Sequence, residues 1–209
     1  DPSGSVISIH PDAFDRHLRA FERHGGRVVG LETLLSLDDD AHAVALTFDD
    51  AFENFATVAW PRLRDRGFTA TVFVPTAFAG RTNGWTGGRR LQVPRLPLLD
   101  WDALARLAGD GVEIGSHTRS HPDLRTLDAG ALLDEIEGAA EMIRAETGTH
   151  PGSFAYPFGF LDDAVAAAVA RVHDRACTME HRALRTAEDP LRLPRLDVFY
   201  LRRPESLPA

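Results

Sequence analysis

The chain has 209 residues, of which 44% are hydrophobic and 26% are charged. This length can bury one compact core, so we expect a single domain that covers residues 1–209. The net charge of -8 is opposite to that of a surface for phosphate backbones, so nucleic acid is not an expected partner. All 23 basic side chains are arginines, which excludes chemistry that needs a lysine Schiff base or a P-loop lysine.

No run of about 18 apolar residues is present, so we expect a soluble chain without a transmembrane segment. The cytoplasm is favoured because no signal peptide is visible, although the compartment and the oligomeric state stay open. The single cysteine, Cys177, can form no internal disulfide and lies in a short apolar segment, which predicts that it is buried.

Apolar runs alternate with amphipathic stretches along the whole chain, which is typical of βα units around a mostly parallel sheet or barrel. The fold class is therefore α/β. In chain order we expect a helix at 11–24, strands at 27–30 and 43–48, a helix at 52–67, a strand at 69–75, a helix at 101–109, a strand at 112–115, a helix at 128–148, a strand at 153–156, a helix at 162–173, and extended segments at 176–179 and 195–200. Residues 80–97, which include Trp85, show neither the helical nor the strand periodicity of apolar residues. They predict an insertion loop, which is either a solvated surface loop or a lid over a substrate.

Two adjacent carboxylates, Asp49 and Asp50, directly follow the apolar strand 43–48. The carboxyl ends of strands in α/β folds meet at one rim, where sites form. Neighbouring side chains on a strand diverge, so one carboxylate can bind a cation while the other stays free as a base. A turn capped by aspartate is the alternative interpretation.

Two histidines, His117 and His121, follow the strand 112–115. Imidazoles four residues apart fall on one face of a helical turn and can hold one divalent ion. No glutamate follows the first histidine, as it does in the zincin metalloproteases, so a base must come from elsewhere, and Asp49 is available.

A third cluster, Tyr156-Pro157-Phe158-Gly159, ends the strand 153–156. The proline fixes the backbone and the glycine relaxes it, so the peptide between them can direct an N–H into a site as an oxyanion donor. Taken alone, this cluster predicts no more than a turn.

Together the three clusters resemble the motifs of the polysaccharide deacetylases, the NodB-like carbohydrate esterases of family four, over about 14–198. Thr47-Phe48-Asp49-Asp50 looks like the first motif, with Asp49 in the place of the catalytic base and Asp50 in that of a metal ligand. The segment 117–121 is similar to the second motif, whose two histidines, here His117 and His121, complete the metal site.

The third cluster is similar to the third motif, in which the N–H of the aromatic residue after proline, here Phe158, helps to hold the oxyanion. The resemblance implies a distorted, incomplete (β/α) barrel and a metal-dependent hydrolase that removes acetyl from an N-acetylated amino sugar. Zinc suits the implied ligands best, and cobalt or nickel would also fit. We expect Tyr156 and Trp85 to contact the carbohydrate substrate.

The chain departs from the family pattern at several positions. Ala51 replaces the usual glycine after the two aspartates, and Ala155 stands where many members carry an arginine that orients the base. Arg195 is our candidate for that role, since a guanidinium can hold Asp49 by a bidentate pair. A surface ion pair is the alternative for Arg195.

Protonation of the departing amine needs an acid, and no histidine follows His181, where the family often supplies one. The chain begins at Asp1 in a loop-like segment, so we expect the acid and a first barrel strand to precede it, with His10 and His181 in reserve. An unpaired strand edge near the metal should mark the place of that strand. The other histidines are expected on the surface of helices or loops, among them His17, His24, His42, His150 and His173.

Other functions stay open. The substrate is expected to be a polysaccharide, oligosaccharide or glycoconjugate, but a small non-polymeric glycoside or another linear or cyclic amide would suit the same chemistry. A catalytically idle carbohydrate-binding homologue is a further alternative, given Ala51, Ala155 and the missing acid. The complete set of Asp49 and the three expected ligands argues against idleness.

Overall fold

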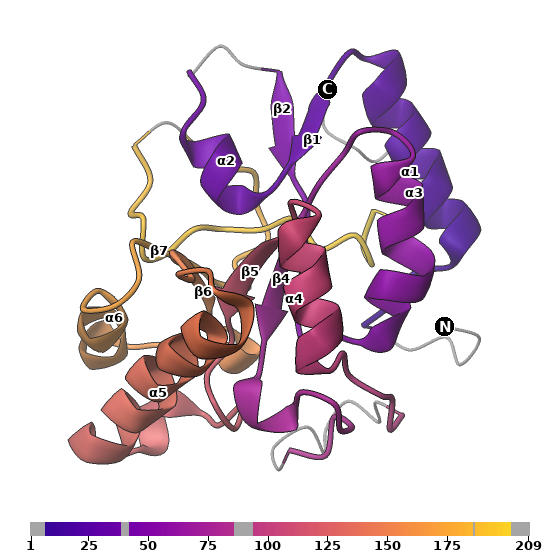
Figure 1. Ribbon diagram of the computed structural model, residues 1–209. Coiled ribbons are helices and arrows are strands. Elements are labelled where there is room, and N and C mark those ends of the chain that lie inside the picture. Colours follow the sequence, from indigo (N-terminus) through magenta and orange to yellow (C-terminus); the bar gives the residue numbers. More distant parts are fainter. Residues whose placement is uncertain (1–6, 39–41, 86–93, 186, 202–209) are drawn as a thin grey trace.

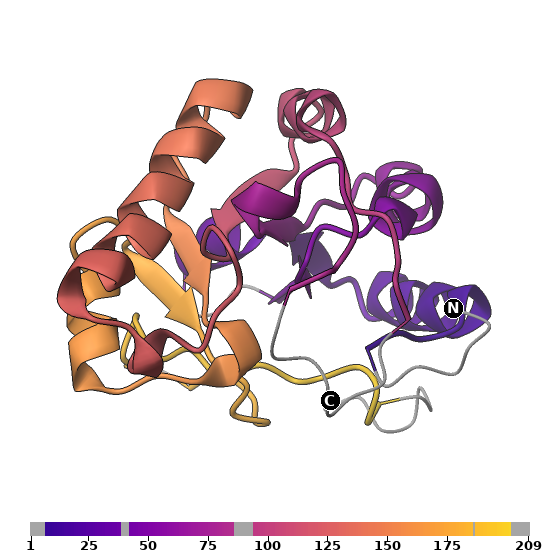
Figure 2. The ribbon, with the colours of Figure 1, turned by 90° about the horizontal axis from the view of Figure 1, so that it is seen from below.

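The computed structural model describes residues 7–38, 42–85, 94–185 and 187–201. Its centre is a curved parallel sheet with helices on the outer face (Figures 1 and 2). The strands are β1 (Arg27–Val29), β2 (Ala43–Ala45), β3 (Thr47–Phe48), β4 (Thr71–Val74), β5 (Glu113–Ser116), β6 (Ser153–Ala155) and β7 (Arg175–Cys177). The α-helices are α1 (Pro11–Arg23), α2 (Leu31–Leu35), α3 (Trp60–Arg64), α4 (Trp101–Gly109), α5 (Ala129–Thr147) and α6 (Asp163–Val169).

The strands follow one another around the sheet in chain order. β1 pairs with β2, and the other strands form the order β3-β4-β5-β6-β7. Leu46 joins the two groups, because its N–H bonds to the Val29 carbonyl at 3.2 Å and its own carbonyl accepts the Thr71 N–H at 2.9 Å. After β7, Leu193 continues the sheet beside Cys177. The sheet curls without closing, which confirms the expected α/β fold with a distorted, incomplete barrel.

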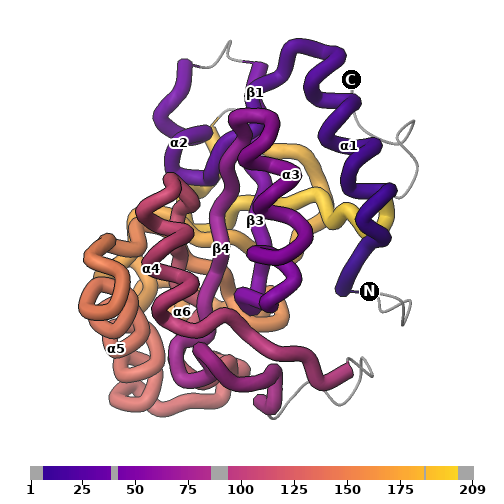
Figure 3. Tube along the Cα trace, turned by 45° about the vertical axis from the view of Figure 1, so that its right-hand side comes forward, coloured from indigo at the N-terminus to yellow at the C-terminus, as the bar shows by residue number. Residues whose placement is uncertain are grey.

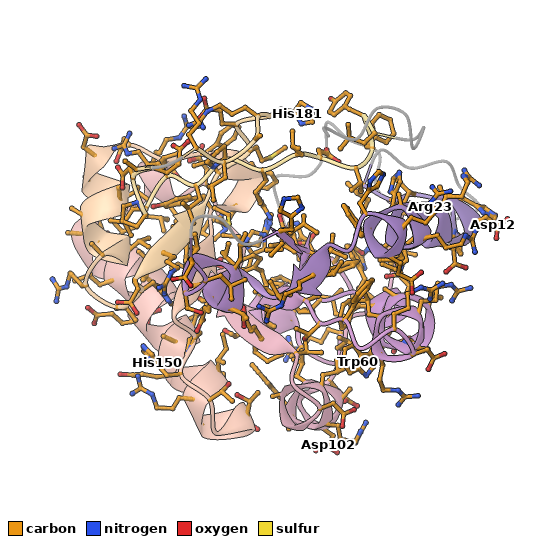
Figure 4. The ribbon with its side chains drawn as sticks, turned by 90° about the horizontal axis from the view of Figure 1, so that it is seen from above. Asp12, Arg23, Trp60, Asp102, His150 and His181 are labelled. Atoms are coloured by element: carbon orange, nitrogen blue, oxygen red, sulfur yellow. The ribbon has the colours of Figure 1, made fainter. Side chains whose placement is uncertain are left out.

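The main core lies between the outer face of the sheet and α1, α3 and α4. Val72 and Val74 of β4 pack there with Leu18, Leu63 and Leu104, all at most 1% exposed. Figure 4 places Trp60 between α3 and α4, whereas Asp102 and His150 lie at the outer edge. A second core joins α5 and α6 to β6, so the helices fix the positions of the strand ends.

Glu113, at the start of β5, caps α2 from across the barrel. Its carboxylate accepts the N–H groups of Glu32 and Thr33, both at 2.9 Å, and the hydroxyls of Thr33 and Thr71, both at 2.7 Å. A side chain at Gly30 would place its Cβ 2.1 Å from the Glu113 carboxyl carbon, so it would displace this carboxylate from its hydrogen bonds. The sequence did not predict α2.

The capped helix α2 fills one end of the barrel. Leu31 packs against Phe73, Cys177 and Leu193, each buried inside the curl of the sheet. Cys177 is buried as expected, and burial raises the pKa of its thiol to about 11. Space for a site therefore remains at the opposite end, where the strands have their carboxyl termini.

Two expected elements have another form. The helix expected at 52–67 contains a π-helical turn, Phe55–Ala59, before α3, in which the Trp60 N–H bonds to the Phe55 carbonyl. Pro61 has no N–H to continue the normal pattern, which accounts for the change. The extended segment expected at 195–200 instead ends in a turn, because the Tyr200 N–H bonds to the Asp197 carbonyl at 3.1 Å.

Two histidines expected at the surface are buried. His17 is 3% exposed and its Nε2 bonds to the Leu201 carbonyl at 2.7 Å, while His173 is 2% exposed and its Nδ1 bonds to the Pro151 carbonyl at 2.8 Å. These backbone carbonyls each satisfy one ring nitrogen away from water, whereas His173 Nε2 is buried without a hydrogen-bond partner among the described residues. In Figure 3 the C-terminal segment crosses behind β3 and ends beside α1. None of the helices in the described ranges is both long and apolar enough to cross a bilayer.

Candidate metal and catalytic site

Asp50, His117 and His121 converge at the carboxyl end of the sheet. Asp50 follows β3, and both histidines lie in the loop that follows β5. Asp50 Oδ1 lies 3.6 Å from His117 Nε2 and 3.5 Å from His121 Nε2, and the two Nε2 atoms are 3.2 Å apart. Within the described ranges, no other three His, Cys, Asp or Glu side chains gather their ligand atoms in this way.

This arrangement suits a divalent metal ion. Ligand atoms about 2.0–2.2 Å from a tetrahedral zinc ion lie about 3.3–3.6 Å from one another, close to the separations observed here. Asp50 Oδ1 is buried and has no hydrogen-bond partner among the described residues, so a cation would supply the partner it lacks. One carboxylate and two imidazoles also form a donor set that zinc, cobalt and nickel accept.

A hydrogen bond to the backbone determines which ring nitrogen of His117 carries the hydrogen. His117 Nδ1 lies 2.7 Å from the Ala155 carbonyl, which can only accept, so Nδ1 carries the hydrogen and Nε2 keeps its lone pair toward Asp50. Burial lowers the pKa of His117, and burial together with the His117 charge lowers the pKa of His121 to about 2. Both imidazoles are therefore neutral, as metal binding requires.

The two histidines meet through a loop and not through the helical turn that we expected from their spacing. Residues 117–121 are not helical, and Thr118 and His121 have φ angles of 68° and 59°. The His121 N–H bonds to Thr118 Oγ1 at 2.9 Å. Residues with left-handed backbone angles reverse the direction of the chain. This reversal brings the His121 ring back beside the His117 ring.

Asp49 lies beside the ligand group and is held by Arg195. Arg195 Nη1 is 2.6 Å from Asp49 Oδ1 and Nη2 is 2.9 Å from Oδ2, which is a bidentate pair. The same guanidinium donates to the Thr178 carbonyl at 3.0 Å and to Thr47 Oγ1 at 3.3 Å. The Arg195 side chain is only 18% exposed, so this pair belongs to the site and is not a surface ion pair.

The two adjacent carboxyl groups have opposite pKa shifts. Burial alone would raise the pKa of Asp49, but the charge and hydrogen bonds of Arg195 outweigh burial and hold that pKa at about 2. Burial and the Asp49 charge raise the pKa of Asp50 to about 8, in the absence of a cation. Asp49 therefore keeps its negative charge throughout the neutral range, whereas Asp50 needs a positive partner to do so.

Phe158 lies beside His121. It occupies the middle of the 3₁₀ turn Pro157–Gly159 after β6, with a φ of 59°. Its ring meets the His121 ring edge to face, with 4.6 Å between the centroids. The turn that carries the expected oxyanion donor therefore borders the metal ligands.

The two expected substrate contacts differ in position. Trp85 packs against the His121 ring with 4.6 Å between the centroids, and it meets Phe78 at 5.2 Å. Tyr156, by contrast, is 1% exposed and its hydroxyl donates to the Leu191 carbonyl, so its side chain belongs to the core and our expectation for it was wrong.

The arms of the insertion loop are ordered around Trp85. The Asn83 N–H bonds to the Leu96 carbonyl at 3.2 Å, and the Leu98 N–H bonds to the Arg81 carbonyl at 2.8 Å. These bonds join the two arms and place Trp85 next to the ligands. Residues 86–93 of this loop lie outside the described residues.

The reserve histidines have partners elsewhere. His10 caps α1 by accepting the Asp12 N–H at 3.2 Å, and His181 accepts the Asp197 N–H at 3.1 Å and lies at the periphery in Figure 4. β3 pairs with β4, and the described strands leave its other edge free beside Asp49, as we expected. That residues before Asp1 supply a strand and the acid stays a prediction.

Sequence reasoning missed one residue that supports the site. Glu135 of α5 accepts the N–H groups of Arg119 and Ser120, which lie between the two histidines. Nothing in the sequence distinguishes it from the other acidic residues of that helix, because its partners lie 15 and 16 positions away in a loop.

Comparison with known proteins agrees with the fold. A family model for polysaccharide deacetylases matches residues 36–175. The chain therefore belongs to the polysaccharide deacetylase family. Among curated relatives, a chitin deacetylase from Colletotrichum lindemuthianum is 30% identical over 115 residues, which cover 55% of this chain and 41% of that protein. A gellan lyase from a Bacillus species is 31% identical over 137 residues, 65% of this chain but 5% of that protein.

Solved structures share the architecture. The deacetylase PplD from Streptococcus pyogenes, solved in complex with acetate, has a TM-score of 0.77 at 22% identity, covering 90% of this chain and 80% of its own. IcaB from Ammonifex degensii has a TM-score of 0.75 at 19% identity, covering 92% and 87%. At these identities the likeness establishes the curled parallel half-barrel.

Proposed function

We propose that the protein is a metal-dependent hydrolase that removes acetyl groups from an N-acetylated amino sugar in a polysaccharide, oligosaccharide or glycoconjugate. The observation that carries the proposal is the convergence of Asp50, His117 and His121 beside Asp49, in a chain of this family. The relative named as a chitin deacetylase supports the substrate class, although the matched segment covers less than half of that protein.

Each residue of the site has a proposed role. Asp50, His117 and His121 would hold the ion, and a divalent ion in such a site supplies Lewis acidity. Asp49 would take a proton from the attacking water, with its orientation set by Arg195. The Phe158 N–H would donate to the acetyl oxygen as that atom gains negative charge. Trp85, beside His121, would guide the sugar ring.

The arginine pair argues against an idle homologue. Ala155 leaves vacant a position that many family members fill with an arginine, but Arg195 reaches Asp49 from another segment. A bidentate pair fixes both the charge and the orientation of the carboxylate. The departure at Ala155 is therefore compensated within this chain.

Acetate release tests the proposal. The protein, loaded with zinc, cobalt or nickel, is incubated with N-acetylglucosamine and with its oligomers, and free acetate is measured. We expect release that a chelator stops and added metal restores, and that is absent in His121→Ala. Comparison of monomer with oligomers separates a small glycoside from a polymer as the substrate. Metal-loaded protein that releases acetate from none of these sugars would contradict the proposal.

A further inference from the structure

The loop from His117 to His121 has an unfavourable backbone conformation. Thr118 and His121 both have positive φ angles, which residues with a Cβ rarely adopt. Such a shape persists only where its surroundings hold it. The carbonyl groups of Thr118 and Arg119 are held on one side, since they accept the N–H groups of Thr76 and Ala77 at 3.1 and 2.9 Å.

The N–H groups of the same loop are held by one carboxylate. Glu135 Oε2 accepts the Arg119 N–H at 2.9 Å and the Ser120 N–H at 2.8 Å, and Oε1 accepts the Ser120 hydroxyl. Glu135 lies on α5 next to Ile136, which is 0% exposed and anchors the helix in the core. A rigid helix therefore presents one half-buried side chain to three donors between the two ligands.

The two histidines depend on this loop to different degrees. His117 is fixed independently, because its N–H bonds to the Val74 carbonyl at 3.0 Å and its Nδ1 bonds to the Ala155 carbonyl at 2.7 Å. His121 Nδ1 is buried and has no hydrogen-bond partner in the described part of the protein. No side-chain bond of that kind orients the His121 ring, so its position follows from the backbone of the loop and from its ring contacts with Trp85 and Phe158.

We propose that Glu135 is a positioning residue for the metal site: by fixing the Arg119 and Ser120 N–H groups, it keeps His121 where it can share an ion with His117 and Asp50. Glu135 does not touch the ligand atoms, and it acts through the loop. The inference rests on the metal site of the proposed function. Residues that orient metal ligands typically change metal affinity by about 10–100-fold when removed.

Neighbouring residues offer matched variants. Asp134 of α5 pairs with the Arg119 side chain at 2.6 Å and is 63% exposed, so Asp134→Ala removes a negative charge beside the same loop without touching its N–H groups. Glu135→Gln keeps an oxygen that can accept both N–H bonds, and the Ser120 hydroxyl can then accept from the new amide. Glu135→Ala removes all three side-chain bonds, and the Arg119 N–H keeps only its bond to the Glu135 backbone carbonyl at 3.2 Å.

The experiment measures metal binding by competition with a chelator, the visible spectrum of the cobalt-loaded protein, and hydrogen exchange of the Ser120 amide in the metal-free protein. For Glu135→Ala we expect a Kd at least about tenfold higher, an altered cobalt spectrum and faster exchange. Glu135→Gln should stay within about threefold of the original Kd, and Asp134→Ala within about twofold.

The outcomes separate this inference from the proposed function. An unchanged Kd and cobalt spectrum in Glu135→Ala would overturn the role of Glu135, as would an equal loss in Asp134→Ala, which would point to charge alone. If Glu135→Ala does not fold, Glu135→Asp decides, because a carboxylate one methylene shorter cannot reach both amides; original affinity in that variant would overturn the inference. Original protein that binds no metal would instead contradict the proposed function.

Discussion

Arg195 connects two segments that are 146 positions apart in the sequence. Its guanidinium joins the Thr178 carbonyl after β7 to Asp49 after β3, and it crosses the side of the barrel where the sheet does not close. The arginine therefore both lines the site and fixes the carboxylate that we propose as its base. Because all three of its nitrogens donate to protein groups, we assign it a positioning role and not one in contact with substrate.

Arg195→Met should lower kcat by about 10–100-fold while the metal content stays near one ion per chain. Without the guanidinium, burial raises the pKa of Asp49 and the carboxylate loses its fixed orientation. Steady-state kinetics and elemental analysis measure the two quantities. Arg192→Met is the matched control, since Arg192 pairs at the surface with Asp163. Unchanged kcat in Arg195→Met would remove the positioning role.

Asp49→Asn should reduce turnover by at least about 100-fold, because an amide cannot accept the proton of the attacking water. Metal content should stay near stoichiometric, since Asp49 is not among the three proposed ligands. Acetate release and metal analysis on the same preparation give both results. Loss of metal in this variant would make Asp49 a ligand and reverse the assignment of the two aspartates.

At the scale of elements, α2 is stabilised by a residue of another element. Isolated helices as short as Leu31–Leu35 are unstable in water, and the backbone N–H groups at the start of this one are satisfied by Glu113 of β5. The cap also aligns Leu31 with the interior of the barrel. The end of the barrel remote from the site therefore depends on a single carboxylate.

Glu113→Ala should lower the free energy of unfolding by about 2–4 kcal/mol, because four donors lose their acceptor in a half-buried position. Urea unfolding followed by circular dichroism measures the change. Glu137→Ala serves as the control, since its ion pair with Arg171 lies at the surface and should contribute less than about 1 kcal/mol. Equal effects in the two variants would contradict this account of α2.

The features that could be predicted from the sequence are those whose signal lies within one short segment of the chain. The segments after two apolar strands contain the candidate site residues Asp49, Asp50, His117 and His121. The absence of an arginine at Ala155 led us to predict that Arg195 orients Asp49. The cap of α2 lies 81 positions from Glu32, and its signal exists only after the sheet has formed. The π-helical turn before Pro61 and the burial of Tyr156 likewise depend on packing that no local pattern records.

At the scale of the whole molecule, stability should depend on pH through His173. Burial lowers the pKa of this imidazole to about 4, against the partly compensating bond to the Pro151 carbonyl. The unfolded chain, with a pKa of 6.5 for this residue, binds the proton first as the pH falls. The contribution of neutral His173 is therefore complete above pH 6.5 and is lost progressively down to about pH 4.

His173→Asn should reduce this acid sensitivity, because the amide still donates to the Pro151 carbonyl but does not titrate. Between pH 6.5 and 4 the original protein should lose about 3 kcal/mol more unfolding free energy than the variant. Urea unfolding at several pH values measures the two slopes. Parallel slopes would show that His173 does not carry the pH dependence.

The pairing of Asp49 with Arg195 also sets an order of events during synthesis. At about 5–20 residues per second, a ribosome needs about 7–30 s to add the 146 positions between them. During that interval a nascent chain holds both aspartates and later both histidines, but not the arginine that fixes the proposed base. The proposed activity should therefore arise late, after Arg195 has been added to the chain.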